Sequence, residues 1–340
     1  MKQRILVTGG TGYIGSHTTV KLQEAGYEVV IIDNLSNSNE NVIDGIEKIT
    51  GQRPAFVKGD CTDLETLRKL FKDYPGIKGI INFAASKAVG ESVKKPLLYY
   101  RNNLNTLINL LELMPEFGVK GIVFSSSCTV YGEPDVNPID ETAPIKKATS
   151  PYGNTKQISE EIIEDYVASG APIKSILLRY FNPIGAHPSG LIGELPLGVP
   201  QNLVPFLTQA AAGIRDQLTV FGNDYSTPDG SCIRDYIDVN DLAEAHVVAM
   251  ERLLDNPDIP PVEVFNLGTG NGLSVLELIK AFESATGVKV PHKIGERREG
   301  DIEKIWADPA KANNILGWKA KSDINDTMRN AWKWQTKCKN

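Results

Sequence analysis

Short apolar runs recur along the first half of the chain, separated by longer stretches that are apolar on one side only. The runs lack alternating polar positions, as buried parallel strands do. They lie at 5–7, 29–32, 55–57, 80–83, 122–124 and 176–181. Helical spacing between them is clearest from about Leu97 to Phe117 and again from Tyr152 onward. This alternation predicts an α/β fold built on a doubly wound parallel sheet.

The pattern changes after residue 182, where Gly and Pro become frequent and the alternation weakens. There we expect loops and short elements. The predicted elements are a strand at 218–221, a returning strand at 262–268, a helix capped by Ser274 and Glu277 that ends at Gly287, and a helix that starts at Asp308 and Pro309. Two interleaved domains follow: a cofactor domain over 1–182 with a return segment at about 236–270, and a smaller mixed α/β substrate domain over 183–235 and 271–340.

Composition narrows the class of protein. The 340 residues are 41% hydrophobic and 23% charged, as in soluble globular proteins. The formal net charge of −6 argues against a broad nucleic-acid surface. The four cysteines lack metal-type spacing, and we expect reduced thiols, a cytoplasmic protein and no metal site. We expect neither a signal peptide nor a transmembrane helix, since a strand pattern begins by residue 4 and no apolar run is long enough.

A glycine-rich turn follows the first predicted strand. Gly9, Gly12 and Gly15 are spaced so that the turn and the start of the next helix can approach a pyrophosphate, whose charge the helix dipole favours. Asp33 ends the second strand, where a carboxylate accepts hydrogen bonds from an adenosine ribose and repels a 2′-phosphate. This Rossmann-type βαβ unit therefore predicts NAD rather than NADP. At the ends of later strands, Asp60, Phe83, Ala84 and Lys87 are candidates to line the same cofactor.

Tyr152 and Lys156 are four residues apart, which places both side chains on one face of a helix. A tyrosine normally loses its proton near pH ~10, and a nearby ammonium favours the phenolate, so we expect Lys156 to lower the pKa of Tyr152. Ser127, at the end of a strand, is placed to bind the same substrate oxygen. The three predict a proton-transfer device for an alcohol or ketone. The same spacing is common on solvated helix faces, so the assignment depends on the rest of the chain.

Taken together, these features resemble the extended short-chain dehydrogenase/reductase family and, within it, the UDP-sugar 4-epimerases. The likeness covers nearly the whole chain. Its more specific stretches are 33–38, 87–92, 179–188, 221–236 and 297–301. The resemblance implies tightly held NAD, a UDP-hexose substrate and a homodimer. It also implies interconversion of UDP-glucose and UDP-galactose by reversible oxidation at sugar C4 through a 4-keto intermediate.

Family likeness also assigns site residues. Catalysis falls to Tyr152, Lys156 and Ser127. The cofactor residues it implies are Gly9, Gly12, Tyr13, Ile14, Gly15, Asp33, Asn34, Leu35, Ser36, Asn37, Ser38, Asp60, Cys61, Phe83, Ala84, Ala85, Ser86, Lys87, Asn102, Ser127, Tyr152, Lys156 and Phe181. The implied substrate residues are Lys87, Ser127, Tyr152, Asn182, Asn202, Leu203, Thr219, Val220, Phe221, Arg234, Arg298, Asp301 and Ile305.

Two departures and two alternatives bear on these expectations. Sugar-nucleotide 4,6-dehydratases of the family carry an Asp-Glu pair where this chain has Cys128 and Thr129, which disfavours dehydration. Ile305 occupies a position near the sugar that is a bulky Tyr in some epimerases and a small residue in others, so we expect N-acetylhexosamines to be poor substrates. The alternatives are a 4-epimerase for another UDP-sugar (an N-acetylhexosamine, pentose or uronic acid) and a catalytically silent NAD-binding sensor.

Overall fold

The computed structural model describes residues 3–298 and 301–338, which form two compact units. The first unit comprises Met1–Gly132, Pro144–Tyr180 and Ala243–Phe265. The second unit comprises Glu133–Ala143, Phe181–Leu242 and Asn266–Asn340. The short segment Glu133–Ala143 thus belongs to the second unit, although nothing in its pattern separates it from its neighbours in sequence.

The first unit is built on a seven-stranded sheet with the strand order β11-β6-β5-β4-β1-β2-β3. The strands are β1 (Arg4–Thr8), β2 (Glu28–Asp33), β3 (Ala55–Lys58), β4 (Ile77–Asn82), β5 (Gly121–Ser127), β6 (Lys174–Tyr180) and β11 (Val262–Leu267). Every neighbouring pair from β3 through β6 is parallel. The order reverses between β1 and β4, as in a doubly wound Rossmann sheet, and so confirms the predicted fold class.

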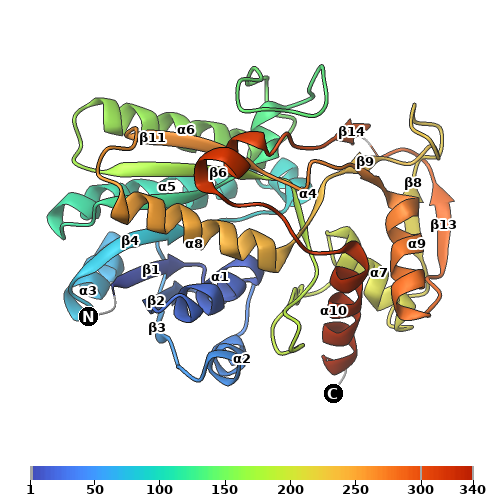
Figure 1. Cartoon of the computed structure of the whole chain (residues 1–340), viewed down its shortest axis with the longest axis horizontal. Helices are drawn as coiled ribbons and strands as arrows, with labels where there is room; N and C mark the ends of the chain where they lie inside the picture. Colours follow the sequence, from blue (N-terminus) through green and yellow to red (C-terminus); the bar gives the residue numbers. More distant parts are fainter. Residues whose placement is uncertain (1–2, 299–300, 339–340) are drawn as a thin grey trace. The chain divides into compact units, whose positions relative to one another are not determined.

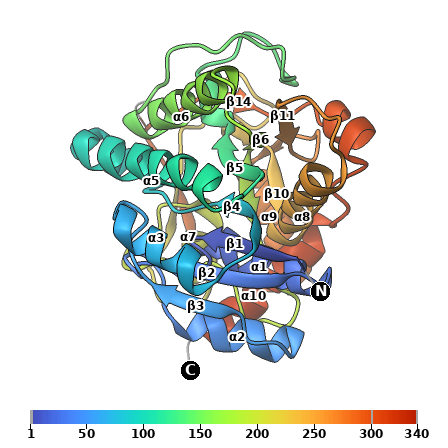
Figure 2. The same cartoon turned by 90° about the vertical axis from the view of Figure 1, so that its left-hand side faces the viewer.

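Helices cover both faces of this sheet. They are α1 (Tyr13–Glu24), α2 (Asn41–Thr50), α3 (Leu64–Asp73), α4 (Val89–Lys94), α5 (Pro96–Glu116), α6 (Pro151–Ala168) and α8 (Val239–Asp255), with a 3₁₀ turn η1 (Cys128–Tyr131). Figure 2 shows α5 and α6 on one face and α1 and α8 on the other. The pattern did not predict α2, whose interior Gly45 and lack of a side-chain cap weaken its helical signal.

The described residues of the second unit form short sheets and the helices α7 (Leu203–Ala211), α9 (Val275–Thr286) and α10 (Ile324–Lys337) (Figure 1). Its strands are β7 (Asn182–Ile184), β8 (Leu218–Phe221), β9 (Ile233–Arg234), β10 (Tyr236–Asp238), β12 (Leu273–Ser274), β13 (His292–Gly295) and β14 (Lys304–Ile305). They pair as β10-β7, β12-β9-β14 and β13-β8. The strand at 218–221 and the capping box at Ser274 are confirmed.

The stretch after residue 182, where loops and short elements were expected, also contains helix α7. This helix buries Val204 and Leu207 in a core that includes Phe282 of α9 and Met328 of α10. The helix expected from Asp308 starts there, with the Asp308 carboxylate accepting from the Ala310 N–H at 2.9 Å. It then widens into a π-helical turn over Ala312–Leu316. No helix in the described part of the chain is long and apolar enough to cross a membrane.

Candidate active site

The glycine-rich turn between β1 and α1 leaves no room for side chains. A Cβ on Gly15 would lie 2.3 Å from the carbonyl oxygen of Gly9. Gly9 itself has φ +69°, and a Cβ there would lie 2.9 Å from the Ala84 nitrogen. Helix α1 begins at Tyr13, and its N-cap residue Gly12 has no side chain to cap it, so the first turn presents backbone N–H groups to an anion. A diphosphate fits such a cradle, and any side chain at Gly9 or Gly15 would fill it.

Asp33, at the end of β2, organises the loop that follows it. Its carboxylate accepts from the N–H groups of Thr11 at 3.2 Å and Leu35 at 2.9 Å, and from the Ser38 hydroxyl at 3.2 Å. Leu35 has a left-handed backbone with φ 60°, which this local hydrogen bond supports. The structure therefore brings the predicted residues of 33–38 together beside the glycine turn.

Two further strand ends complete the cradle in the first unit. Asn34 donates to the Asp60 carboxylate at 3.1 Å, which joins the loop after β2 to the end of β3. After β4, the Ser86 hydroxyl accepts from Asn102 of α5 at 3.1 Å. The Cys61 side chain faces the core, and burial raises the pKa of its thiol. The predicted residues Phe83, Ala84 and Ala85 follow β4 and directly precede Ser86, and all three are partly exposed.

The Ser127, Tyr152 and Lys156 side chains meet at the end of β5. Helix α6 starts at Pro151, after Ser150, whose hydroxyl accepts from the Gly153 N–H at 3.1 Å, so Tyr152 lies in the first turn. Lys156, one turn later, lies with its Nζ 5.8 Å from the centre of the Tyr152 ring. Tyr152 and Ser127 share a side-chain hydrogen bond. The predicted trio is thus assembled on one helix face and one strand end.

The ionisation of the trio differs from the expectation. Burial raises the pKa of Tyr152 to about 12, with a further rise from Cys128, and the hydrogen bond from Ser127 only partly offsets these. Burial lowers the pKa of Lys156 to about 8, opposed by the negative charge of Glu160. In the protein by itself the net pKa of Tyr152 is therefore raised, not lowered, although Lys156 lies on the same helix face. Desolvation of the phenolate outweighs attraction to a partly desolvated ammonium.

Sequence reasoning missed the buried polar groups behind this trio. The carbonyl oxygen of Ser125 accepts from Lys156 Nζ at 2.5 Å. Glu160 is buried and faces Ser126 and Arg179. One signal was available, because Glu160 lies four residues after Lys156 and must share its helix face.

In the second unit, three predicted substrate residues gather beyond paired strands. Strand β8 pairs with β13 so that Phe221 lies opposite Gly295, which carries the chain toward Arg298. The Arg298 guanidinium lies 5.5 Å from the centre of the Phe221 ring and donates to Asp301 at 2.5 and 3.1 Å. Arg298 is exposed and able to meet an anion. Glu299 and Gly300 of the same stretch lie outside the described residues.

Arg234 and Ile305 face each other on paired strands of the second unit, β9 and β14. Ile305 is buried, while Arg234 is partly exposed and donates to the carbonyl of Ile233 at 2.8 Å. The next residue, Asp235, accepts from the Thr269, Gly270 and Ala307 N–H groups and so holds β9 in place.

The remaining predicted substrate residues are scattered within the second unit. Asn202 precedes α7 and donates to Glu194 at 2.6 Å. Asn182 begins β7, Leu203 begins α7, and Thr219 and Val220 lie within β8, where Val220 is buried in the core. Among the described residues, no hydrogen bond joins these side chains to Arg298.

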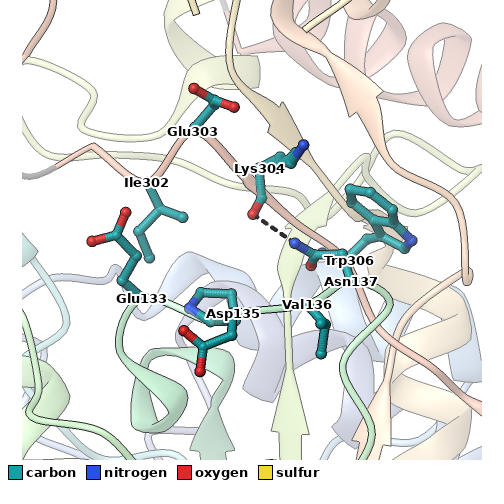
Figure 3. A pocket seen from close by; sticks show the side chains of 9 residues that line it. Glu133, Asp135, Val136, Asn137, Ile302, Glu303, Lys304 and Trp306 are labelled. Carbon is teal, nitrogen blue, oxygen red and sulfur yellow. Dashed lines mark hydrogen bonds between the residues drawn. The ribbon is translucent and has the colours of Figure 1, made fainter. Parts of the chain in front are cut away.

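The second unit also contains a pocket of about 470 Å³, between 133–137 and 302–306 (Figure 3). Glu133, Asp135 and Glu303 bring three carboxylates to it. Its walls are linked by a hydrogen bond of 3.1 Å from the Asn137 amide to the carbonyl of Lys304, drawn in Figure 3. None of the predicted site residues that the structure describes lines this pocket, and its carboxylates would repel a diphosphate. Among the described residues, no cluster of His, Cys, Asp or Glu is placed to hold a metal ion.

The chain is similar to proteins of known family and known structure. Residues 6–331 match the GDP-mannose 4,6 dehydratase family. UDP-glucose 4-epimerase of Bacillus subtilis is 51% identical over 332 residues, covering 98% of this chain and 96% of the relative. The crystal structure of UDP-glucose 4-epimerase from Stenotrophomonas maltophila with NAD and formylated UDP-arabinopyranose has a TM-score of 0.95 and 48% identity, covering 99% of both chains. The Bifidobacterium longum enzyme with NAD⁺ and UDP has a TM-score of 0.94 and 46% identity, again covering 99% of both chains.

Proposed function

We propose, since the chain belongs to the UDP-glucose 4-epimerase family of extended short-chain dehydrogenases/reductases, that it interconverts UDP-glucose and UDP-galactose. One observation carries the proposal: Ser127, Tyr152 and Lys156 converge at the end of β5 in the unit that holds the dinucleotide cradle. A silent sensor would need the cradle alone. The presence of an acid–base trio in the same unit supports an enzyme.

NAD is the cofactor we propose. The glycine turn would hold its pyrophosphate and Asp33 its adenosine ribose, with the loop 34–38, Asp60 and the segment 83–87 around it. When bound and oxidised, it would accept hydride from sugar C4 and return it, and its positive ring would favour nearby negative charge. Relatives of known structure are named as complexes with NAD or NAD⁺, which supports this choice.

Tyr152 removes the proton from the sugar 4′-hydroxyl and later returns it. Because burial holds its pKa at about 12, the resting side chain is a neutral phenol, and a further positive charge must be bound nearby before it can act as the base near neutral pH. Ser127 hydrogen-bonds the reacting sugar oxygen and is placed to pass the proton. Lys156 contributes positive charge and a donor from the same helix face.

Residues of the second unit would bind the UDP part of the substrate. Arg234 and Arg298 supply cations for a diphosphate in a chain of net charge −6, and the guanidinium fork suits phosphate oxygens. The other substrate residues proposed are Asn182, Asn202, Leu203, Thr219, Val220, Phe221, Asp301 and Ile305. Firm binding of UDP together with looser binding of the hexose lets the 4-keto sugar turn over before it is reduced.

Dehydration, the reaction in the name of the matching family, is disfavoured by the same site. Elimination of water requires acid–base groups beyond Tyr152. The two residues after Ser127 are Cys128, a buried thiol, and Thr129, and neither carries a carboxylate. Epimerisation needs only the trio and a retained cofactor.

We further propose a homodimer and a cytoplasmic location. Val93, Leu97 and Leu98 on α4 and α5 are 61%, 75% and 49% exposed, and such neighbouring apolar side chains favour a second copy as the cover. None of the four cysteines forms a disulfide in the described part of the chain, which supports a reducing compartment. The functional division of the chain into a cofactor domain (1–182, with 236–270) and a substrate domain (183–235 and 271–340) is part of the same proposal.

The test uses purified protein without added cofactor. UDP-galactose is supplied and UDP-glucose is followed by chromatography for the wild type, Tyr152→Phe and the control Tyr166→Phe, a partly buried tyrosine on the same helix. Conversion by the wild type and the control, but at least ~100-fold less by Tyr152→Phe, is the expected result. No conversion by NAD-loaded wild type would remove the UDP-hexose assignment.

A further inference from the structure

A buried ion pair joins α6 to β6 behind the proposed catalytic trio. Arg179 donates from Nε to Glu160 Oε1 at 2.9 Å and from Nη2 to Oε2 at 2.6 Å, which is a two-bond fork. The two side chains are only 7% and 6% exposed. A pair this deep is part of the interior, not of the solvated helix face.

The remaining hydrogen bonds of the pair reach the segment that carries Ser127. The Ser126 hydroxyl donates to Glu160. Ser126 lies between Ser125, whose carbonyl accepts from Lys156, and Ser127 itself. The pair therefore binds the end of β5 at Ser126, between the residue that accepts from Lys156 and Ser127 itself.

A second contact holds the turn that follows Ser127. Arg179 Nη1 donates to the Tyr131 hydroxyl at 3.1 Å, and its guanidinium lies 5.0 Å from the centre of that ring. Tyr131 ends η1, which starts directly after Ser127. One ion pair thus ties together α6, the end of β5, η1 and β6, the elements that place the trio.

Stability alone is a weak reason for such a pair. Removing two charges from water costs about as much as their attraction returns, and well-packed apolar residues often serve as well. The charges do have a local use, because Glu160 lies one helical turn beyond Lys156 and its negative charge opposes the effect of burial on the Lys156 ammonium. Arg179 partly neutralises the negative charge of Glu160 through its two hydrogen bonds to that carboxylate.

We infer that Glu160 and Arg179 are positioning residues of the reaction, which hold Ser127 and Lys156 in register and balance the charge that the Lys156 ammonium meets. The inference rests on the proposed function, because the trio must be catalytic for its positioning to matter. Other titratable groups around the trio and the pair come from several elements. Burial raises the pKa of Tyr152 on α6, Tyr180 on β6 and Tyr99 on α5, so these side chains are neutral near pH 7, and Glu91 of α4 binds Tyr99 and Lys95. Cys128 lies in η1, and Glu164 on α6, whose pKa is raised by burial, interacts electrostatically with Glu160 and Arg179.

The test is the pH dependence of kcat for Glu160→Gln and Arg179→Met. On the proposed mechanism kcat falls at high pH as Lys156 loses its proton. Loss of Glu160 leaves the Arg179 cation unbalanced behind the trio, so this fall moves to lower pH. Loss of Arg179 leaves the Glu160 anion, so the fall moves to higher pH. We expect each midpoint to move by about one pH unit, a tenfold change in rate at a fixed pH on the falling limb. The two variants lose stability alike but shift in opposite directions, which a purely structural pair would not produce.

Two more variants keep the test decisive. The double variant Glu160→Gln/Arg179→Met removes both charges, and its midpoint should lie between those of the single variants. Where one single variant fails to fold, the midpoint of the double variant is compared with that of the other single variant. Glu263→Gln is the matched control, because Glu263 forms the same two-bond fork with Arg252, at 2.6 and 2.9 Å, between β11 and α8. It should keep the wild-type midpoint. Wild-type midpoints in the folded, NAD-loaded pair variants would overturn the inference.

Failure of the proposed function has a different signature. The wild type is assayed first, and absence of epimerisation there counts against the function alone. The pair is then tested by urea unfolding across pH, since titration of Lys156 also changes the free energy of unfolding. The rise in that free energy with pH should begin at lower pH in Glu160→Gln and at higher pH in Arg179→Met. Superimposable curves would overturn the charge-balancing role.

Discussion

Lys156 Nζ donates to the carbonyl oxygen of Ser125, 2.5 Å away, and so ties helix α6 to strand β5, which ends at Ser127. The ammonium is buried, which lowers its pKa from 10.5 to about 8. Keeping a charge in a protein interior lowers the free energy of unfolding, so a buried ammonium is expected where the protein's function needs it. That loss of stability should be measurable.

Lys156→Met should be at least as stable as the wild type at pH 7 while losing epimerase activity. The native protein binds fewer protons at Lys156 than the unfolded chain between about pH 8 and 10.5, so the wild-type free energy of unfolding should rise through that window. The full change corresponds to about 3 kcal/mol, reduced by the lost bond to Ser125. Urea unfolding at several pH values, with matched NAD content, measures it. A stability difference that does not vary with pH would contradict the assignment.

Tyr152 should titrate at lower pH when oxidised NAD is bound than when the bound cofactor is reduced. The protein alone raises the Tyr152 pKa to about 12, so the positive ring must provide the compensating charge. Phenolate absorbance, taken as the difference between the wild type and Tyr152→Phe, should appear at least about one pH unit lower in the oxidised complex. Identical titrations in the two cofactor states would show that another group activates the base.

Asp33→Asn should weaken discrimination between NAD and NADP. Replacing the carboxylate removes charge-assisted hydrogen bonds to the ribose and the repulsion of a 2′-phosphate, so the ratio of the two affinities should change about 10- to 100-fold. Because Asp33 also accepts from Thr11 and Leu35, loosening of the loop should weaken binding of both cofactors. The informative quantity is therefore the ratio, measured by equilibrium titration. An unchanged ratio with weaker binding of both would limit Asp33 to a structural role.

Ile305 should limit the size of the hexose. It is buried on β14 opposite Arg234, and its branched side chain has little freedom to move aside. UDP-N-acetylglucosamine should be used at least about 10-fold less well than UDP-glucose by kcat/KM, and Ile305→Ala should narrow that gap. Equal kcat/KM for the two sugars in the wild type would sink the idea.

Leu97→Glu should separate the proposed dimer. Leu97 is 75% exposed on α5, next to Val93 and Leu98, and a carboxylate there would be desolvated in an interface. Sedimentation or light scattering should show a dimer for the wild type and a monomer for the variant. Ile214→Glu, at a 51% exposed apolar position in the second unit, is the control and should stay dimeric. A monomeric wild type would contradict the proposed dimer.

Much of the fold was readable because its signals are local. Buried parallel strands are apolar runs wherever they occur, and a capping box such as Ser274 with Glu277 acts over a single turn. The glycine turn, Asp33 and the pairing of Tyr152 with Lys156 likewise depend on neighbours in sequence. Where local signals were weak the sequence predicted nothing, as for α7, for α2 with its interior glycine, and for the π-helical turn after Asp308.

The sequence alone was enough to predict the Rossmann sheet and the glycine turn, because short-range patterns encode both. It also placed Tyr152 and Lys156 on one helix face, while the assignment of Ser127 to the same catalytic trio followed from the family resemblance over the whole chain. Their ionisation was decided only by tertiary structure. Burial depends on residues distant in the chain, and it raises the Tyr152 pKa while lowering that of Lys156. The pairing of Glu160 with Arg179 was likewise hidden, because only the packing of α6 on β6 brings these two charges to within 2.6 Å.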